Sequence, residues 1–553
     1  MTPSHGPLAL TPQTFGQDPS GPPVELLQTH IGWVYLVGAY AFKLKKQVKY
    51  DFLDFTALSQ RQWACTREVI LNRRLCPELY IGLVPVLRSD DGRTFIDPRY
   101  VLLEDGSEAG FDARLPEIES RAGARIVDWA VWMRRLPAER MLDRMLAAGA
   151  VTVADAAAIA AILGDFYRRQ RGQVPPGGLG DLAAVRVNVE ENLREGAQLD
   201  RAALSAASLA LIERRARHFL NRHGELIQRR AADGFVVDGH GDLRAENICL
   251  PAGQPPLLFD CIEFNDRFRI CDSALDAAFL AMDFDARGRG DLSRALLEHY
   301  QAACDPQLPP RLLNFYQGYR AFVKGKVCAW IAADVQVEAA QREHARVEAV
   351  QFFDLAVRYA LQGEAVLFVF CGMAGSGKST LAADLSRRLN AAHFATDLLR
   401  KEIVPRGLPP EERYAPAQSY RVYRALLERG AEVLQKSQMA VLDGTFTRKS
   451  IRAEAAQMAA KHGARAILVW ADCPPERIAA HLEERRKAGA LCGSEAGAAI
   501  SERQRAAFSK PSAREGFSAV CRIDTGASLD SARAAMWEAV LAALMPALPS
   551  AAR

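Results

Sequence analysis

The sequence predicts two domains of different fold class: a bilobal α+β domain, followed by an α/β domain with a doubly wound parallel sheet. Three observations lead to this prediction. After a Pro/Gly-rich start, short β-type runs fill residues 24–103. Helical spacing of apolar residues then dominates from about 140 to 360. From there to about 545, apolar strands alternate with amphipathic helices, which is typical of βαβ units.

The composition is that of an ordinary globular protein, with 49% apolar residues, 25% charged residues and a net charge of +4 over 553 residues. This charge is too small to argue for nucleic-acid binding by itself. The sequence contains no uncharged apolar run long enough to span a membrane. Residues 1–23 lack the basic and apolar regions of a secretory signal, so we expect a disordered tail there and a cytoplasmic protein. The cysteines form no C-x-x-C pair, which favours buried thiols over disulfides or zinc.

The first domain is expected over residues 24–360, with a small lobe at about 24–125 and a large lobe at about 126–360. The small lobe combines four β-type runs, WVYLV, YAFKLK, IGLVPVL and TFIDPRYVLL, with one helix near 58–75. The large lobe is helical, except where FVVDGHGDLRAENICL and PLLFDCIEF predict two β runs with polar turns.

The second domain is expected over 361–546, before a short tail at 547–553. A long helix ending near Tyr359 leads into the apolar run AVLFVF, which is typical of a buried parallel strand. Two further strands, MAVLD and AILVWA, follow among amphipathic helices.

A phosphate-binding loop follows the first of these strands. The run from Gly372 to Thr380 matches G-x-x-x-x-G-K-[ST] between a strand and a helix. Glycines let backbone N–H groups converge on phosphate oxygens, and the helix N-terminus adds its positive end. This pattern predicts an ATP site with Mg²⁺, in which Lys378 reaches the β/γ-phosphates and the Ser379 hydroxyl is a metal ligand. The nucleotide-contacting residues are predicted to be Gly372, Gly375, Ser376, Gly377, Lys378, Ser379 and Thr380.

Further charged residues follow strands of the same domain. Asp397 could accept the proton of an acceptor hydroxyl, with Arg400 holding an anionic group, although Asp397 could instead be a helix N-cap. Asp443 ends a strand, where a carboxylate can hold Mg²⁺. Arg448 and Arg452 follow it one helical turn apart. Arg485 and Arg486 suit a lid over the triphosphate, or a solvated surface.

This part of the chain, about 363–545, resembles small-molecule and polynucleotide kinases of the P-loop class, with gluconate-kinase-like ATPases among the nearest relatives. The resemblance rests on the phosphate loop, the Thr-Asp-x-x-Arg segment and the Asp-Gly-Thr strand end. It implies a P-loop NTPase fold and leaves the acceptor open.

A second phosphotransfer pattern lies in the first domain. In HGDLRAEN, Asp242 precedes Asn247 by five residues, and Asp260 follows thirteen residues later. Phosphoryl transfer needs a carboxylate beside the acceptor hydroxyl, which fits Asp242, and two metal ligands, which fit Asn247 and Asp260. The pattern resembles the catalytic segment of protein kinases and, more closely, that of the aminoglycoside phosphotransferase family.

That resemblance implies further residues. Lys43, in a β run, would contact the α/β-phosphates, and Glu68 would be its ion-pair partner. Gly32 and Gly38 give only a poor glycine-rich loop. His240 would brace the catalytic segment.

Over about 24–545 the chain resembles bifunctional aminoglycoside phosphotransferase/ATP-binding proteins, through THIGWVYL, KLKKQVKYDFLDF, LNRRLCPELY, HGDLRAENI, FDCIEFNDRFR and VLDGTFTRKS. The family name does not make aminoglycosides the substrates. Outside the central pattern, Asp272 and Asp276 share one helical face and are interpreted as bracing rather than substrate-binding residues. Glu263 and Asp266 could form an acidic mouth for a cationic acceptor.

The leading functional hypothesis is an ATP-dependent kinase that phosphorylates a hydroxyl group of a small molecule, with two nucleotide sites on different folds. An alternative is a P-loop kinase or ATPase regulated by a non-catalytic, ligand-binding first domain. A nucleic-acid end kinase is disfavoured because the near-neutral chain lacks basic-aromatic interleaving. The sequence predicts neither a membrane partner nor an oligomeric state.

Overall fold

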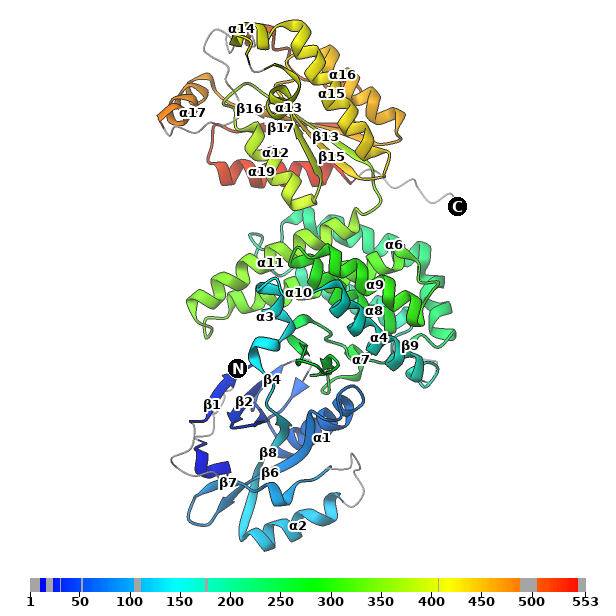
Figure 1. Ribbon diagram of the computed structural model, residues 1–553, viewed down its shortest axis with the longest axis vertical. Helices are drawn as coiled ribbons and strands as arrows, with labels where there is room; N and C mark the ends of the chain where they lie inside the picture. The colour runs from blue at the N-terminus through cyan, green and yellow to red at the C-terminus, as the bar shows by residue number, and fades with distance from the viewer. Residues whose placement is uncertain are drawn as a thin grey trace. The chain divides into compact units, whose positions relative to one another are not determined.

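The computed structural model describes residues 10–15, 23–29, 31–50, 53–103, 111–174, 178–405, 407–487 and 505–545. The chain divides into two compact units (Figure 1). The first comprises residues 1–188 and 222–317, and the second comprises residues 189–221 and 318–553. Three helices contribute residues to both units: α5 (Leu182–Gly196), α6 (Ala206–Ala232) and α10 (Pro310–Ala333).

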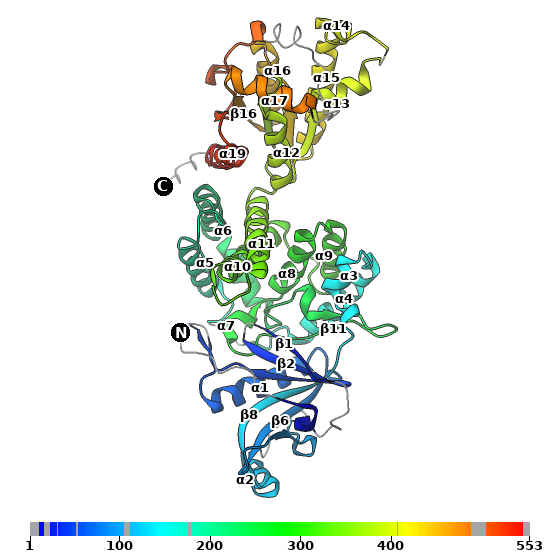
Figure 2. The same cartoon turned by 90° about the vertical axis from the view of Figure 1, so that its left-hand side faces the viewer.

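A six-stranded antiparallel sheet opens the first unit, in the order β1-β2-β3-β8-β6-β7. Its strands are β1 (Glu25–Gln28), β2 (Gly32–Val37), β3 (Tyr40–Lys45), β6 (Tyr80–Ser89), β7 (Thr94–Ile96) and β8 (Ala124–Arg134). Helix α1 (Leu58–Arg73) lies against β6 and β8 (Figure 2). Its buried residues include Val69. The predicted runs WVYLV, YAFKLK and IGLVPVL and the helix near 58–75 are therefore confirmed. Strands β1 and β8 were not predicted, and β8 extends the sheet past the expected lobe boundary at 125/126.

The predicted run TFIDPRYVLL is a strand only over its first three residues. A 3₁₀ turn, η2 (Pro98–Tyr100), follows, because Pro98 has no N–H for a ladder and the Asp97 carboxylate caps the turn by accepting from the Arg99 N–H. Helix α2 (Phe111–Ala122), which the sequence reasoning did not anticipate, precedes β8.

The remainder of the first unit is mainly helical. It contains α3 (Leu142–Ala147), α4 (Val153–Gln170), α8 (Ser273–Ala286) and α9 (Gly290–Cys304), and α4 packs closely on α9. The predicted embedded β runs occur as short strand pairs, β9 (Val236–Asp238) with β12 (Ile270–Asp272) and β10 (Ile248–Cys249) with β11 (Leu257–Leu258). Three short elements complete it: β4 (Lys49–Tyr50), β5 (Leu53–Asp54) and α7 (Asp266–Arg269).

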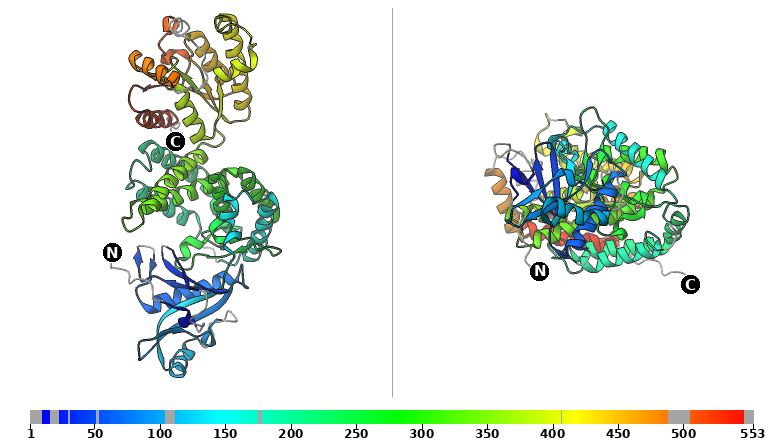
Figure 3. Two further views of the ribbon diagram at one scale, coloured as in Figure 1. Left: turned by 60° about the vertical axis from the view of Figure 1, so that its left-hand side comes forward. Right: turned by 90° about the horizontal axis from the view of Figure 1, so that it is seen from below.

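The second unit contains a five-stranded parallel sheet in the order β14-β15-β13-β16-β17. The left view of Figure 3 shows this sheet between its helices. The strands are β13 (Val366–Cys371), β14 (Ala392–Ala395), β15 (Met439–Asp443), β16 (Arg465–Asp472) and β17 (Ala519–Asp524). Helices α12 (Lys378–Leu389) and α19 (Leu529–Ala543) contact each other on one face, while α15 (Pro416–Leu434) and α16 (Lys449–Lys461) pair on the other. The predicted doubly wound sheet is confirmed.

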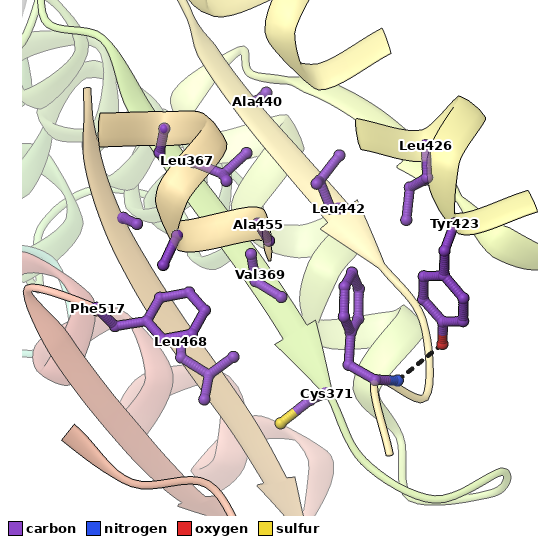
Figure 4. Close-up of a cluster of buried hydrophobic side chains, with 14 of the residues drawn as sticks. Leu367, Val369, Cys371, Tyr423, Leu426, Ala440, Leu442, Ala455, Leu468 and Phe517 are labelled. Atoms are coloured by element: carbon purple, nitrogen blue, oxygen red, sulfur yellow. Dashed lines mark hydrogen bonds between the residues drawn. The ribbon is translucent and has the colours of Figure 1, made fainter. Parts of the chain in front are cut away.

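The sheet buries its apolar side chains under the helices. Leu367, Val369 and Cys371 alternate along β13 and pack with Leu442 and other buried residues beneath α15 and α16, as Figure 4 shows. Each fully buried leucine contributes about 1.5–3 kcal/mol. This core fixes the ends of β13 and β15, which carry the candidate site.

An ion pair holds the C-terminal end of helix α12, opposite the end that follows the phosphate loop. Arg388 donates from Nε and Nη2 to the carboxylate of Asp354, at 2.9 and 2.7 Å, in helix α11 (Ala339–Ala360). The Arg388 guanidinium lies 3.5 Å from the ring centroid of Trp537, whose Nε1 donates to Ser208 Oγ at 2.9 Å. The phosphate-loop helix is therefore anchored to α6, α11 and α19.

Within the described residues, none of the helices is long and apolar enough to cross a membrane. The ten cysteines in the described part of the chain are free thiols, and most are buried, as the sequence predicts.

Candidate active sites

The phosphate loop connects β13 to α12. Gly372, Gly375 and Gly377 all have positive φ, at 152°, 85° and 82°. A Cβ on Gly372 would lie 2.7 Å from the carbonyl oxygen of Ala471 and from Ser376 Oγ, so a side chain would not fit there. The loop thus exposes the backbone that the sequence pattern requires for a phosphate cradle.

Several buried polar groups at this loop have no partner among the described residues. The Ser376 hydroxyl and the Oδ1 atom of Asp443 make no hydrogen bond there. Lys378 is only 9% exposed and forms no ion pair with the carboxylates of the described residues. Buried charges are normally paired, so a buried lysine without an ion-pair partner within 4 Å among the described residues, at a glycine loop, indicates an anion site. Ser379 is exposed in the first turn of α12, beside Thr380.

Sheet register brings the predicted acidic residues to this loop. Asp443 ends β15 and is paired with Phe370 on β13 and with Ala395 on β14. Asp397 lies in the first turn of helix α13 (Thr396–Ile403), whose N-cap is Ala395, so the N-cap alternative for Asp397 is wrong. Burial raises the pKa of Asp397, and the nearby Asp443 carboxylate also raises it, against the opposing effect of Lys378.

Arg400 is buried beside Asp397. Its Nη1 donates to the Arg413 carbonyl at 3.0 Å, its guanidinium lies 4.4 Å from the Tyr414 ring centroid, and its Nε has no hydrogen-bond partner within the described residues. A guanidinium in this setting can hold an anionic group.

His393 belongs to the same cluster, although sequence reasoning gave it no role. Its Nε2 lies 3.9 Å from Asp443 Oδ2, and burial lowers the pKa of the imidazole. Register explains the contact, because His393 and Ala395 lie on the same face of β14, two residues apart. In the sequence, the one feature that could have indicated a role for His393 was the predicted strand end at Asp443.

The loop after Asp443 is strained and firmly held. Phe446 is fully buried with φ of 41°, which is uncommon for a bulky residue. Its N–H donates to the Tyr423 hydroxyl at 2.9 Å, drawn as the dashed line in Figure 4, and the same hydroxyl pairs with Thr445 Oγ1 at 3.1 Å. The Thr445 carbonyl accepts from the Gly372 N–H at 3.3 Å, which links this loop to the phosphate loop.

Arg448 and Arg452 have different environments. Arg448 is exposed. Arg452 is fully buried and donates from Nε and Nη2 to both carboxylate oxygens of Glu515, at 2.6 and 2.8 Å, and from Nη1 to the Phe446 carbonyl at 2.8 Å. Arg452 is therefore not available to a nucleotide; it supports the strained loop.

Helix α17 (Pro475–Lys487) lies against the phosphate loop. The ring Nδ1 of His481 is 3.1 Å from the Gly375 carbonyl oxygen, and a Cβ on Gly375 would be 3.2 Å from Ile478 Cγ2. The side chains of Arg485 and Arg486, the predicted lid arginines, lie outside the described residues.

The first unit holds a separate cluster around Lys43 on β3. Lys43 Nζ lies 2.8 Å from Glu68 Oε1 in α1 and 2.5 Å from Asp260 Oδ1. Burial opposes the charge of Lys43, but Asp260 and Glu68 outweigh it and hold the lysine pKa well above its ordinary value. Asp260 has φ of 65°, a strained conformation for a residue other than glycine. Lys43 therefore contacts both Glu68, its expected ion-pair partner, and Asp260, a predicted metal ligand.

Asp242 and Asn247 lie together in the turn that follows β9. Asn247 Nδ2 donates to the Asp242 carbonyl at 2.8 Å and to Asp242 Oδ2 at 3.1 Å. Arg244, which sequence reasoning did not single out, donates from Nε and Nη2 to the two carboxylate oxygens of Asp242, at 2.8 and 2.9 Å. Arg244 follows Asp242 by two residues, and this spacing alone does not indicate that the two side chains form an ion pair.

Asp276 braces this turn, as predicted. Its carboxylate accepts from the backbone N–H groups of His240 and Gly241, at 2.7 and 3.0 Å, and from the Tyr167 hydroxyl at 2.9 Å. His240 in turn contacts the Phe259 carbonyl through Nε2, at 2.8 Å. Asp272 also has a structural role, since it caps α8 and pairs with Arg230. It ends β12 instead of sharing a helical face with Asp276, so that part of the prediction is wrong.

The turn between β1 and β2 is held against the neighbouring strand β3. A Cβ on Gly32 would be 3.0 Å from the Leu44 carbonyl oxygen, so Gly32 allows close approach to β3. The Lys46 ammonium donates to the Thr29 carbonyl at 2.5 Å and lies 4.4 Å from the Trp33 ring centroid. Lys46 thereby supports a turn with few glycines.

The donor sets suit Mg²⁺ with a nucleotide better than a metal held by protein alone. In the described residues, His, Cys, Asp and Glu do not gather in groups of three or more that could hold a metal ion. Mg²⁺ commonly takes one or two protein oxygens together with phosphates and water. Asp443 and Ser379 fit this in the second unit, where Asp443 Oδ1 has no partner among the described residues, and Asn247 and Asp260 fit it in the first.

Comparison with known proteins identifies a domain family for the second part of the chain and a family for most of its length. The family model of an AAA domain (AAA_33) matches residues 367–511. Uncharacterized protein Rv2004c of Mycobacterium tuberculosis is 31% identical over 446 residues, which cover 79% of this chain and 82% of the relative. The chain belongs to its family. Uncharacterized protein Mb2027c of Mycobacterium bovis matches with the same identity and coverage. The residues matched by the family model lie in the part of the chain that resembles P-loop kinases.

Solved structures match each part separately. A gluconokinase from Sinorhizobium meliloti covers 32% of this chain and 93% of its own, with 18% identity and a TM-score of 0.25. A choline/ethanolamine kinase family protein from Mesorhizobium loti covers 62% and 92%, with 13% identity and a TM-score of 0.35.

Proposed function

We propose that the protein is an ATP-dependent phosphotransferase that moves the γ-phosphoryl group of ATP to a hydroxyl of a small molecule. The observation that carries the proposal is the cluster at the phosphate loop, where the charges of the buried Lys378 and of Asp443 both act on the Asp397 carboxylate. A cation, a metal ligand and a base converge there, and this set is what phosphoryl transfer requires. The functional domains are taken as 24–360 and 361–546.

In this mechanism, Asp397 accepts the proton of the acceptor hydroxyl while the acceptor oxygen bonds to the γ-phosphorus and the bond to the ADP oxygen breaks. The raised pKa of Asp397 makes it a stronger base than an ordinary aspartate once it is ionised. Lys378 neutralises the phosphates, and Arg400 holds an anionic part of the acceptor. Bound Mg²⁺ would supply further charge neutralisation at the phosphates, with Asp443 and Ser379 as ligands.

The first unit is proposed as a second kinase site, with Asp242 beside the acceptor, Asn247 and Asp260 as Mg²⁺ ligands, and Lys43 on the phosphates. Support comes from the contacts of Lys43 with both Glu68 and Asp260. A regulatory, non-catalytic first unit is the second candidate. It is favoured by Arg244, which occupies both carboxylate oxygens of Asp242 and would have to share them with an acceptor.

ATP turnover with a pooled extract of cell metabolites distinguishes these candidates. Two working kinases predict that a Lys378→Ala variant retains part of the turnover and that adding Asp242→Asn abolishes the remainder. A regulatory first unit predicts that Lys378→Ala alone abolishes all of it. Turnover unchanged in both variants would contradict the proposal. An ATP-dependent reaction fits the cytoplasmic location predicted from the sequence, and addition of oligonucleotides is expected to leave the rate unchanged.

A further inference from the structure

The cluster around Lys43 extends to a second lysine on the same strand. Lys43 and Lys45 are two residues apart on β3, so their side chains lie on one face of the strand. Lys45 Nζ lies 2.5 Å from Glu68 Oε2 and 2.5 Å from Glu263 Oε1. Glu68 thus forms an ion pair with each lysine, one through each carboxylate oxygen. Asp260, Lys43, Glu68, Lys45 and Glu263 form a continuous chain of alternating charges.

The two ends of this chain differ in exposure. The side chains of Lys45 and Glu68 are fully buried and that of Glu263 is 3% exposed, whereas that of Asp260 is 39% exposed. This burial excludes the alternative that Glu263 forms an acidic mouth for a cationic acceptor. Water and ions can compete for the Asp260 end, while the Glu263 end is sealed from both.

Both ends lie on one short loop, between β11 and α7, and Glu263 follows Asp260 by three residues. The two lysines therefore attach one loop to one strand at two places, and Glu68 connects both lysines to α1. At the exposed place, the Lys43–Asp260 contact occupies an oxygen of the proposed Mg²⁺ ligand. Binding of a metal–nucleotide complex requires that this contact open, since Asp260 must face the metal and Lys43 the phosphates.

We propose that Lys45 and Glu263 form a permanent clamp, which holds Glu68 and the loop of Asp260 in place while the Lys43–Asp260 ion pair opens to admit Mg²⁺ and the nucleotide. The inference rests on the proposed nucleotide site of the first unit. Lys45 and Glu263 are positioning residues, because they act through Glu68 and Asp260. With Lys45 present, Glu68 keeps a cationic partner when Lys43 turns toward phosphate, and the cluster is not left with an unpaired buried carboxylate.

The test measures Mg²⁺-dependent binding of a fluorescent ADP analogue to the full chain carrying Lys378→Ala, which silences the phosphate loop. In this background, Lys45→Met is expected to raise the Mg²⁺ concentration for half-saturation by about 10–100-fold, as removal of outer supports of a metal site usually does. Lys49→Met is the matched control, since that lysine is 68% exposed on the next strand, and it should leave the midpoint unchanged. A purely structural role would lower the folded fraction without moving this midpoint.

Two further variants keep the test decisive. Glu263→Gln preserves shape and should move the midpoint in the same direction, even where Lys45→Met fails to fold. Lys45→Met and Glu263→Gln together should cost no more than Lys45→Met alone, within about a factor of two, because the residues act as one unit. Equal midpoints in the parent and the Glu263→Gln variant would overturn the clamp. If the Lys378→Ala parent binds no nucleotide, the proposed nucleotide site of the first unit is itself wrong.

Discussion

The buried ion pair between Arg452 and Glu515 gives a prediction whose magnitude follows from the contacts. Arg452→Met removes a guanidinium that makes two hydrogen bonds to Glu515 and one to the Phe446 carbonyl. Glu515 is only 4% exposed, so its charge would be left buried and unpaired. Loss of one partner from such a pair costs about 3–5 kcal/mol of unfolding free energy. We therefore expect the second unit to lose about 6–20 °C in melting temperature.

Arg448→Met is the matched control. Arg448 is the N-cap of the same helix, lies one turn away and is exposed, so its replacement should change stability by less than about 0.5 kcal/mol. Thermal melting of the two variants at one scan rate is the assay, and binding of ATP per folded chain is the second readout. Equal melting temperatures for both variants would refute the structural role of Arg452, as would loss of ATP affinity in folded Arg452→Met protein.

Three further predictions concern the phosphate loop and its neighbours. Gly375→Ala, at φ of 85° and with Ile478 Cγ2 3.2 Å from the new Cβ, should cost about 1–2 kcal/mol and weaken ATP binding; calorimetric titration showing normal affinity would contradict this. Tyr423→Phe leaves the buried Phe446 N–H without its acceptor and should cost about 1–3 kcal/mol in urea unfolding, whereas an unchanged midpoint would show that the hydroxyl is dispensable. Burial raises the pKa of Asp397, so its contribution to stability is present below the ordinary aspartate pKa and is lost as pH rises through the raised value. In Mg²⁺-free buffer, Asp397→Asn should gain stability relative to the natural chain as pH rises above about 4, the ordinary aspartate pKa, while losing turnover, and parallel stability curves would contradict the raised pKa.

The phosphate loop could be predicted from the sequence because its geometry is local. Consecutive residues from Gly372 onward supply the positive φ angles and the helix start that the pattern implies. The strand ending at Asp443 was also predictable, since an apolar run gives both its position and its parallel character. Sheet register then places Asp443 beside the end of β13 without any further signal.

Contacts between distant segments could not be predicted in the same way. Lys43, Lys45 and Lys46 lie within four residues, and the sequence does not show which ammonium meets which carboxylate. In the structure, Lys43 and Lys45 both pair with Glu68, and Lys46 donates to the Thr29 carbonyl. These choices depend on strand twist and burial, which a residue pattern does not encode.

Arg452 shows a related difficulty. Arg452 lies on a helix that follows a strand end, one turn from Arg448, and such an arginine can either bind a phosphate or stabilise the fold. Its partner Glu515 lies 63 residues further along the chain. The tertiary fold decides between the two roles by burying Arg452 completely. A sequence pattern can therefore identify the chemistry of a segment before it can identify the residues that support it.

The most direct test of the central claim is the number of nucleotides that one chain binds. Calorimetric titration with ADP and Mg²⁺ should give two nucleotides per natural chain, one for the Lys378→Ala variant, one for a Lys43→Ala variant, and none when both lysines are replaced. A single nucleotide per natural chain that is lost with Lys378→Ala would contradict the account of two sites on two folds.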